Sequence, residues 1–485
     1  MKSALDIIRA SNRPDIFIKF KYAQSKLTLG YVPKSIELMY LESIRSFNNF
    51  NEFYPKKIGP SDFIKHFDDL ITSIQVKGLM KGISNEKIQI DPSGEVHQGA
   101  HRVAILAALK QDISDYEISE DKSDFNFEYF KMNGIQEYVL RFALLIKSEL
   151  NFSTTCFLIH AVVNPILDDQ IKNCIQERTS IVYQTSCKFT LDQILYLKFI
   201  NYRINPNVET WIGNKKNNFS PLRNHAIYSN GNFSTRLIVM PKMEEKDSIN
   251  LKNDIRELVG RGNFSVHSTE SNEEARHLIE ILCHPSTREL FIQKRINTDP
   301  TFISNTQDIS KFEDLKFREL VRNGIIGGSY VLELYNLRKS RDVDIFVRKE
   351  RDNNYESVFD LKHNIEVSDF EQEHPNKSFD EIILDPLKHI KLFGLTFLSL
   401  EELRKWKEER KEYPKDFRDL ELIKESGILG IRKKESKLPK LEKFFWQYRA
   451  FCSRITLQLA RKLYSYRASR FIGKKLKSFI RKMRN

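Results

Sequence analysis

The chain has 485 residues, of which 40% are hydrophobic, so it can build several domains with their own apolar cores. Its five cysteines are scattered, without a Cys-x-x-Cys pair or a Cys/His ligand spacing, which argues against zinc and favours a reducing compartment. The most apolar run, residues 156–167, is too short to span a bilayer, and the N-terminal residues lack the apolar core of a signal peptide. We therefore expect a cytoplasmic, multidomain α+β protein.

The net charge of +13 is concentrated near the C-terminal end of the sequence. Residues 440–485 contain 14 Lys and Arg against one acid, Glu442, which leaves the rest of the chain neutral. Apolar residues in this segment form stripes, so we expect a basic amphipathic helical tail over residues 436–485. Such a helix favours an anionic membrane surface, here the inner membrane face. Docking on the globular part or on a partner is the second interpretation, and binding of nucleic-acid phosphates through the same charge is the third.

In chain order, residues 1–59 are expected to form an N-terminal helical segment, with one helix over residues 33–48. Apolar residues at helical spacing predict a helix over residues 61–78, which Ser61 can cap and Gly78 ends. The sequence then predicts a strand, a turn, a second strand and a helix that opens at Gly99, with the first three over residues 87–90, 91–94 and 95–98.

The stretch Gly99-Ala-His101-Arg102 carries the first candidate site. A helix start offers free N–H groups to phosphate, and a guanidinium suits phosphate oxygens. This layout resembles the ParB/sulfiredoxin-like domain over residues 60–112, within a domain expected at 60–135. The resemblance implies that Gly99, His101 and Arg102 contact the phosphates of a nucleotide. Gln98 stands where the family often has an acid, and the alternative is a surface loop that merely caps a helix.

Residues 136–310 are predicted to form a central mixed α/β region whose role the sequence leaves open. Strands are expected at residues 236–240 and 264–267. The pair Ser271-x-x-Glu274 is a capping-box pattern, which predicts a helix over residues 272–283 with Pro285 as its stop.

The stretch from Gly327 to Val347 carries the second candidate site. Gly327-Gly328-Ser329 is followed by a helix expected over residues 330–337, a basic turn and an apolar strand. Asp342 and Asp344 lie two residues apart on that strand, so their side chains point to the same face. Two converging carboxylates beside a glycine-rich turn suit a divalent cation and nucleotide phosphates. The alternative is that these aspartates are strand-edge acids paired with neighbouring basic residues, namely Arg338, Lys339 and Arg341.

With these residues in view, residues 311–430 resemble a nucleotidyltransferase domain of the DNA polymerase β superfamily, within a domain expected at 311–435. A later Lys415-Asp416-x-x-Asp419 helix, preceded by Arg410, looks like the ending of many bacterial members. The resemblance implies that Gly328 and Ser329 hold a nucleoside triphosphate. It also implies that Asp342 and Asp344 bind Mg²⁺ (or Mn²⁺).

A third carboxylate on a neighbouring strand normally completes such a site. Asp380 is the first choice and Glu366 the second, and neither has a motif of its own. The sequence predicts a short strand within residues 379–386, a further strand over residues 390–398 and a helix capped by Ser399.

Together these features predict a metal-dependent nucleotidyl- or phospho-transferase with a nucleotide substrate and a sugar or glycan acceptor, acting in surface-polysaccharide or glycan synthesis. The ParB-like domain would add a second phosphate site. The alternatives are a nucleotide-sensing binding protein without catalysis and a ParB-like regulator associated with DNA. The neutral globular part and the lack of a DNA-reading motif count against the last.

Overall fold

The structure is a computed structural model. It describes residues 2–53, 56–78, 87–150, 153–160, 165–190, 193–198, 221, 234–260, 262–311, 315–348, 359–360, 364–374, 376–410 and 414–429. The chain is a mixed α+β protein, as predicted, and divides into two compact units at residues 409 and 410. The tail expected at 436–485 lies outside the described residues, among which no helix has the length and apolar character needed to cross a membrane.

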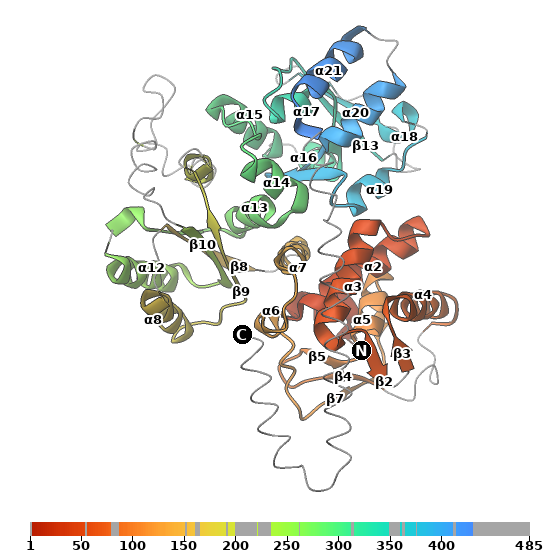
Figure 1. The fold of residues 1–485 in the computed structure, drawn as a ribbon, viewed down its shortest axis with the longest axis vertical. Helices are drawn as coiled ribbons and strands as arrows, with labels where there is room; N and C mark the ends of the chain where they lie inside the picture. The colour runs from red at the N-terminus through yellow and green to blue at the C-terminus, as the bar shows by residue number, and fades with distance from the viewer. Residues whose placement is uncertain are drawn as a thin grey trace, which may run out of the picture. The chain divides into compact units, whose positions relative to one another are not determined.

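The N-terminal helices pack directly on the segment that resembles a ParB-like domain. Helix α2 (Pro14–Leu29) lies along α5 (Ala100–Ala108), as Figure 1 shows, and α1 (Ala4–Ala10) also contacts α5. Strand β1 (Lys2–Ser3) pairs antiparallel with β6 (Asp112–Ile113). Residues 1–59 and the ParB-like segment are therefore joined by helix packing and by strand pairing.

The remaining elements of this region match most of the predicted pattern. The expected helices are present as α3 (Lys34–Asn48) and α4 (Pro60–Lys77), which buries Phe63, Phe67, Ile71 and Ile74. The prediction of a Ser61 cap is wrong, because Gly59 occupies the cap position and Pro60 the first turn. A three-stranded sheet has the order β5-β4-β7, built from β4 (Ile88–Ile90), β5 (Val96–Gln98) and β7 (Tyr116–Ile118). Smaller elements are β2 (Asn51–Phe53), β3 (Lys56–Ile58), α6 (Phe127–Met132) and α7 (Glu137–Glu149).

The central region contains a four-stranded antiparallel sheet in the order β11-β8-β10-β9. The strands of this sheet and the helices of its apolar core follow one another as β8 (Thr154–His160), α8 (Pro165–Gln176), β9 (Tyr183–Lys188), β10 (Ser234–Pro241), α12 (Glu245–Val259) and β11 (Val266–Ser268). The helical residues 193–198 lie between β9 and β10 in the chain. This β-α-β-β-α-β succession is that of the ferredoxin-like motif. Phe157 and Ile159 of β8 belong to one apolar core with residues of α8 and α12. Successive strand residues face opposite sides of a sheet. Cys156, which precedes Phe157, contacts Ala275 of α13 (Asn272–Cys283), so helices cover both faces (Figure 1).

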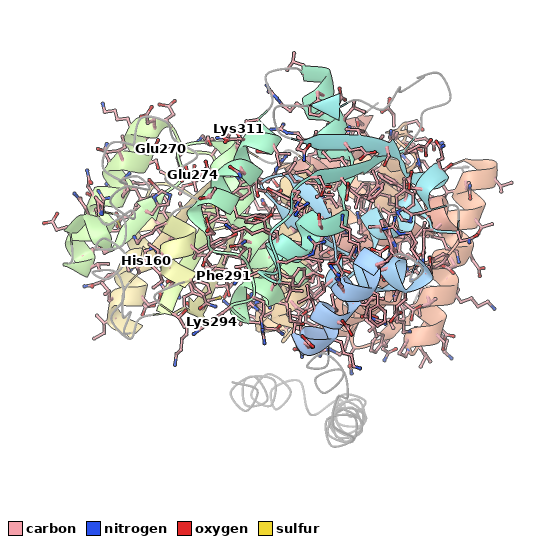
Figure 2. The ribbon with its side chains drawn as sticks, turned by 90° about the horizontal axis from the view of Figure 1, so that it is seen from above. His160, Glu270, Glu274, Phe291, Lys294 and Lys311 are labelled. Atoms are coloured by element: carbon pink, nitrogen blue, oxygen red, sulfur yellow. The ribbon has the colours of Figure 1, made fainter. Side chains whose placement is uncertain are left out.

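The predicted serine cap of α13 is present, but the glutamate of the capping pattern bonds one residue before the cap. The Ser271 hydroxyl accepts the Glu274 N–H at 3.1 Å. The Glu274 carboxylate accepts the Glu270 N–H at 2.7 Å, and Figure 2 shows these two residues close together. Pro285 does not simply stop the helix as expected, because it opens α14 (Pro285–Ile292), which the His284 ring caps by accepting the Thr287 N–H.

The sheet that follows has six strands in the order β14-β15-β13-β12-β17-β16. Its strands are β12 (Ile325–Ile326), β13 (Val343–Val347), β14 (Phe359–Asp360), β15 (Ile365–Asp369), β16 (His389–Leu392) and β17 (Leu395–Leu398). The accompanying helices are α15 (Pro300–Ser310), α16 (Leu315–Asn323), α17 (Gly328–Leu334), α18 (Phe370–Glu373), α19 (Phe379–Leu384) and α20 (Leu400–Glu409). In the second unit, α21 (Pro414–Glu425) forms as predicted.

Two predictions for this sheet are wrong. Residues 379–384 form helix α19 rather than a strand, because Ser378 caps the Glu381 N–H at 3.2 Å and acids occupy the first turn. Residues 390–398 form the hairpin β16–β17 rather than one strand. Phe393 and Gly394 both have positive φ, which is the geometry of a tight hairpin turn.

Candidate functional site

The two aspartates lie at the start of strand β13. Val343 and Ile345 are buried, whereas Asp344 is partly exposed and Asp342 directly precedes the strand. The adjacent strand β15 runs parallel to β13, and the register places Glu366 opposite Asp344. Paired residues of neighbouring strands have side chains on the same face of the sheet. The fold therefore places Asp344 and Glu366 on one face of the sheet, with Asp342 two residues before Asp344.

The glycine turn is built tightly against Asp344. The Gly327 N–H donates to the Asp344 carbonyl at 2.9 Å, which joins the turn to the strand. Gly328 has a φ of +58°, and a Cβ added to it would lie 1.6 Å from Oδ2 of Asp344. Only glycine satisfies both the positive φ and this approach. The carboxylate of Asp344 therefore packs directly against the backbone of Gly328.

The serine of the same turn contacts the other aspartate. Ser329 is 2% exposed, and its hydroxyl donates to Oδ1 of Asp342 at 2.9 Å. The Ser329 hydroxyl also bonds to the hydroxyl of Ser340, which lies in the basic turn before β13. The structure thus brings together Gly328, Ser329, Asp342 and Asp344, the four residues predicted to form this site.

The two candidates for the third carboxylate occupy different places. Asp380 lies in the first turn of α19, not on a strand, and forms an ion pair with Arg348 beyond the end of β13. Glu366 is exposed and lies beside Asp344 in the sheet. The register therefore favours Glu366, the second choice. Its signal in the sequence is the alternation Ile365-Glu366-Val367, with one acid between two apolar residues.

The donor set fits a magnesium ion that is completed by its substrate. Among the described ranges, no three His, Cys, Asp or Glu side chains gather closely enough to hold a metal ion by themselves. Mg²⁺ is commonly bound through one or two carboxylates, with phosphate oxygens and waters as its other ligands. The paired aspartates supply that number of carboxylates, so Asp342 and Asp344 fit the ion predicted for them.

The Lys-Asp-x-x-Asp helix belongs to the second unit. Asp416 and Asp419 are buried on α21, and Nε of Arg410 lies 3.5 Å from Oδ2 of Asp416. Arg410 and Asp416 therefore form an ion pair within this unit.

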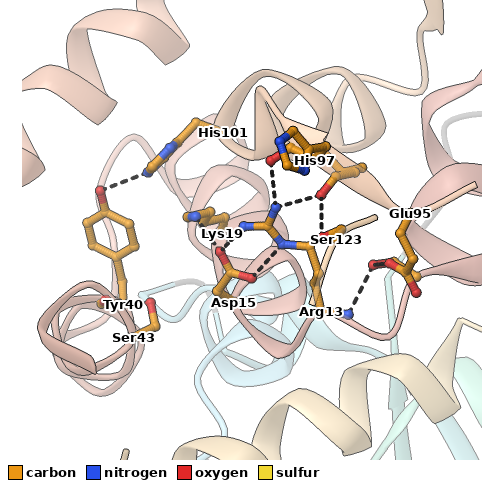
Figure 3. Close-up of polar contacts among 11 residues, drawn as sticks. Arg13, Asp15, Lys19, Tyr40, Ser43, Glu95, His97, His101 and Ser123 are labelled. Carbon is orange, nitrogen blue, oxygen red and sulfur yellow. Dashed lines mark hydrogen bonds and ion pairs between the residues drawn. The ribbon is translucent and has the colours of Figure 1, made fainter. Parts of the chain in front are cut away.

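The ParB-like loop has a different arrangement from the one predicted. Gly99 caps α5 with a φ of +86°, and the guanidinium of Arg102 lies beside it. Nε2 of His101 lies 3.1 Å from the hydroxyl of Tyr40 (Figure 3). The His101 ring also meets the ring of Phe67 edge-on. Burial, together with the charge of Lys19, holds the pKa of His101 well below its ordinary value. His101 is therefore a neutral ring directed into the interior, which is not the orientation of a phosphate ligand.

A buried ionic cluster lies next to this loop, in residues where the sequence offered no chemistry. Asp15 is 1% exposed and accepts from Nε of Arg13 at 3.1 Å and from Nζ of Lys19 at 2.6 Å. Arg13 also donates to the carbonyl of Val96 at 2.6 Å (Figure 3). Burial by itself would raise the pKa of Asp15, but the two cations outweigh it and lower the pKa. Arg13 thus ties the start of α2 to β5, the strand that leads into Gly99.

The sequence was also compared with known proteins. No family model, curated protein or solved structure matched the chain.

Proposed function

We propose that residues 311–429 bind a nucleoside triphosphate with Mg²⁺ (or Mn²⁺) and transfer a nucleotidyl or phosphoryl group to an acceptor hydroxyl. The observation that supports this most is the paired contact of Gly328 with Asp344 and of Ser329 with Asp342. The Asp344 carboxylate occupies the place that a Cβ of residue 328 would take, so the turn and the aspartate fit together closely. Sugars and glycans, which are rich in hydroxyl groups, are the acceptor class that we propose, with a role in surface-polysaccharide synthesis.

Each residue has a defined part in this reaction. Asp342 and Asp344 would hold the cation, which supplies charge neutralisation at the phosphate oxygens. The backbone of the Gly327–Ser329 turn would contact the phosphates of the nucleotide. Glu366 would accept the proton of the acceptor hydroxyl. A bond then forms between the acceptor oxygen and phosphorus, and the bond from phosphorus to the leaving phosphate oxygen breaks.

A second candidate is a nucleotide sensor that binds without turnover. The observation that favours it is that Asp380, the first choice for the third carboxylate, lies on α19 and is paired with Arg348. In that case the paired aspartates would still bind the cation and the nucleotide. Binding assays would then respond to Asp342→Asn, whereas turnover would be absent from every protein tested.

The test uses the full chain with Mg²⁺ and two nucleotide labels in separate reactions, one on the α-phosphate and one on the γ-phosphate. Transfer of the α-label identifies a nucleotidyltransferase, and transfer of the γ-label a phosphotransferase. We expect Asp342→Asn and Asp344→Asn each to lower transfer at least 100-fold, because each removes charge at the phosphate site. The matched control is Asp308→Asn, an exposed acid on α15. Transfer that persists in the double variant, or is absent from the wild type with every acceptor, contradicts a transferase.

The third carboxylate is tested in the same assay. Glu366→Gln is expected to lower transfer about 100-fold or more, as loss of a general base does. Glu371→Gln, another exposed acid in the next helix, is the control and should leave transfer unchanged. Asp380→Asn breaks the ion pair with Arg348 and is expected to have less than a tenth of the effect of Glu366→Gln. If Asp380→Asn lowers transfer more than Glu366→Gln does, Asp380 is the general base.

We also propose that residues 440–485 hold the chain at an anionic membrane surface, supported by their charge and their apolar stripes. For the ParB-like region, the position of Gly99 and Arg102 at the start of α5 supports a nucleotide phosphate site, without a part for His101.

A further inference from the structure

Two serine hydroxyls contact Asp342, and the second of them has no counterpart in the predicted site. Ser329 approaches the carboxylate, with its Oγ 2.9 Å from Oδ1. Ser340 approaches the backbone, with its Oγ 2.7 Å from the Asp342 carbonyl oxygen and 3.3 Å from Oδ1. The Asp342 N–H also points to Oγ of Ser340 at 3.4 Å. Ser340 therefore contacts both the main chain and the side chain of Asp342.

The hydroxyl group of each serine can donate only one hydrogen bond, which limits the hydrogen bonds that Ser329 and Ser340 make. Each hydroxyl has one proton to donate. Ser329 uses its proton on Oδ1 of Asp342, and the nearest acceptor for the Ser340 proton, apart from the other hydroxyl, is the Asp342 carbonyl. Ser340 then fixes the backbone of Asp342, while Ser329 fixes the carboxylate. In this arrangement the two hydroxyls contact different parts of Asp342.

Ser340 is hydrogen-bonded to helix α17. Its N–H donates to Oε2 of Glu333 at 2.8 Å, and Glu333 belongs to α17, the helix that begins at Gly328. The Glu333 carbonyl accepts the side-chain amide of Asn297 at 2.9 Å. One helix therefore carries the glycine turn at its start and anchors Ser340 near its end. Both ends of α17 therefore contact the turn that precedes β13, through Ser329 to Asp342 and through Glu333 to Ser340.

We propose that Ser340 is a positioning residue that presents Asp342 to the divalent cation. The proposal rests on the proposed function, because it assumes that Asp342 binds the cation. A carboxylate held in one orientation loses less freedom when it binds a metal, and outer contacts of this kind change metal affinity by roughly 10- to 100-fold. The Ser329 hydroxyl and the Ser340 hydroxyl together supply that constraint.

The experiment uses the full chain and measures by electron paramagnetic resonance how tightly it binds the Mn²⁺ complex of a non-hydrolysable nucleoside triphosphate, because phosphate oxygens are expected to complete the coordination of the ion. Ser340→Ala is expected to weaken Mn²⁺ binding about 10- to 100-fold, and Ser340→Thr, which keeps the hydroxyl, to stay within about 3-fold of wild type. The control is Ser25→Ala, because Ser25 also donates to a backbone carbonyl but lies on α2. In the transfer assay, Ser340→Ala should raise the Mg²⁺ concentration for half-maximal rate more than it lowers the rate at saturating Mg²⁺.

The outcomes separate the two proposals. If Asp342→Asn abolishes Mn²⁺ binding and Ser340→Ala binds like wild type, Ser340 has no positioning role and the proposed function stands. If wild type and Asp342→Asn bind Mn²⁺ equally, both proposals are wrong. If Ser340→Ala does not fold, Glu333→Gln decides the matter, because it weakens the bond to the Ser340 N–H without changing either hydroxyl. An unchanged Mn²⁺ affinity in Glu333→Gln would then overturn the positioning role.

Discussion

Replacing Gly328 with alanine tests the core of the site with the smallest possible change. The added Cβ would lie 1.6 Å from Oδ2 and 2.8 Å from Cγ of Asp344. The carboxylate must therefore move by roughly 2 Å to regain an ordinary van der Waals distance. The residue must also keep a φ of +58°, which costs a non-glycine residue about 1–2 kcal/mol.

The two costs have different consequences. The backbone cost and the overpacking together should lower the free energy of unfolding by about 3 kcal/mol. The displaced carboxylate should lower the transfer rate about 100-fold or more, because a misplacement of about 1 Å in a reacting group has that effect. Mn²⁺ affinity should fall with the rate, since Asp344 is expected to be a ligand.

Gly260→Ala is the matched control. Gly260 has a φ of +67°, yet a Cβ added there would meet nothing within 4 Å. We expect it to lose about 1–2 kcal/mol of stability and none of the transfer rate. Transfer and urea unfolding are measured for both variants. This account of the turn is wrong if Gly328→Ala keeps more than a tenth of the wild-type transfer rate. It is also wrong if Gly260→Ala lowers the transfer rate as much as Gly328→Ala does.

Three further predictions concern other parts of the chain. Nε2 of His389 lies 3.2 Å from Nε2 of His284, and burial lowers the pKa of both, that of His389 to about 3. In the unfolded chain both histidines bind a proton below a pKa of about 6.5, whereas in the folded chain they stay neutral at pH 5. Each histidine should therefore lower the free energy of unfolding by about 2 kcal/mol at pH 5. Equal free energies of unfolding at pH 7 and pH 5 would contradict this. Arg13→Met should lower the free energy of unfolding by about 3 kcal/mol, because Asp15 loses a buried partner. A loss below about 1 kcal/mol in urea titrations would show that the cluster is not structural. Deleting residues 440–485 should abolish sedimentation with anionic vesicles and leave transfer in solution intact, and a truncated chain that still sediments removes the anchor.

Predictions of local structure succeeded where neighbouring residues decide the outcome. The helix at Gly99 and the serine cap at Ser271 depend on contacts within about four residues, so the pattern alone predicts them. The pairing of Asp342 with Asp344 follows from strand alternation in the same way. The hairpin at Gly394 was missed because its apolar flanks are continuous, and only the positive φ of two adjacent residues separates a hairpin from a long strand.

The candidate site was predicted in part for the same reason. Its glycine turn and two aspartates lie within 20 residues of one another, and their spacing indicated a shared site. The choice between Asp380 and Glu366 depends on which strand pairs with β13, and sheet order is set by tertiary packing rather than by local pattern. The inward turn of His101 likewise depends on Tyr40 and Phe67, which come from two other helices.

The sequence by itself determined the mixed α+β class, the position of most helices and the concentration of charge in the tail. It also determined the four residues around Gly328 and Asp342, because turn chemistry and strand alternation act over short distances. The tertiary structure alone decided the ferredoxin-like order of the central sheet, the ion cluster at Asp15 and the place of Glu366 beside Asp344. These features join segments far apart in the chain, and burial and strand pairing between such segments select them in the folded state only.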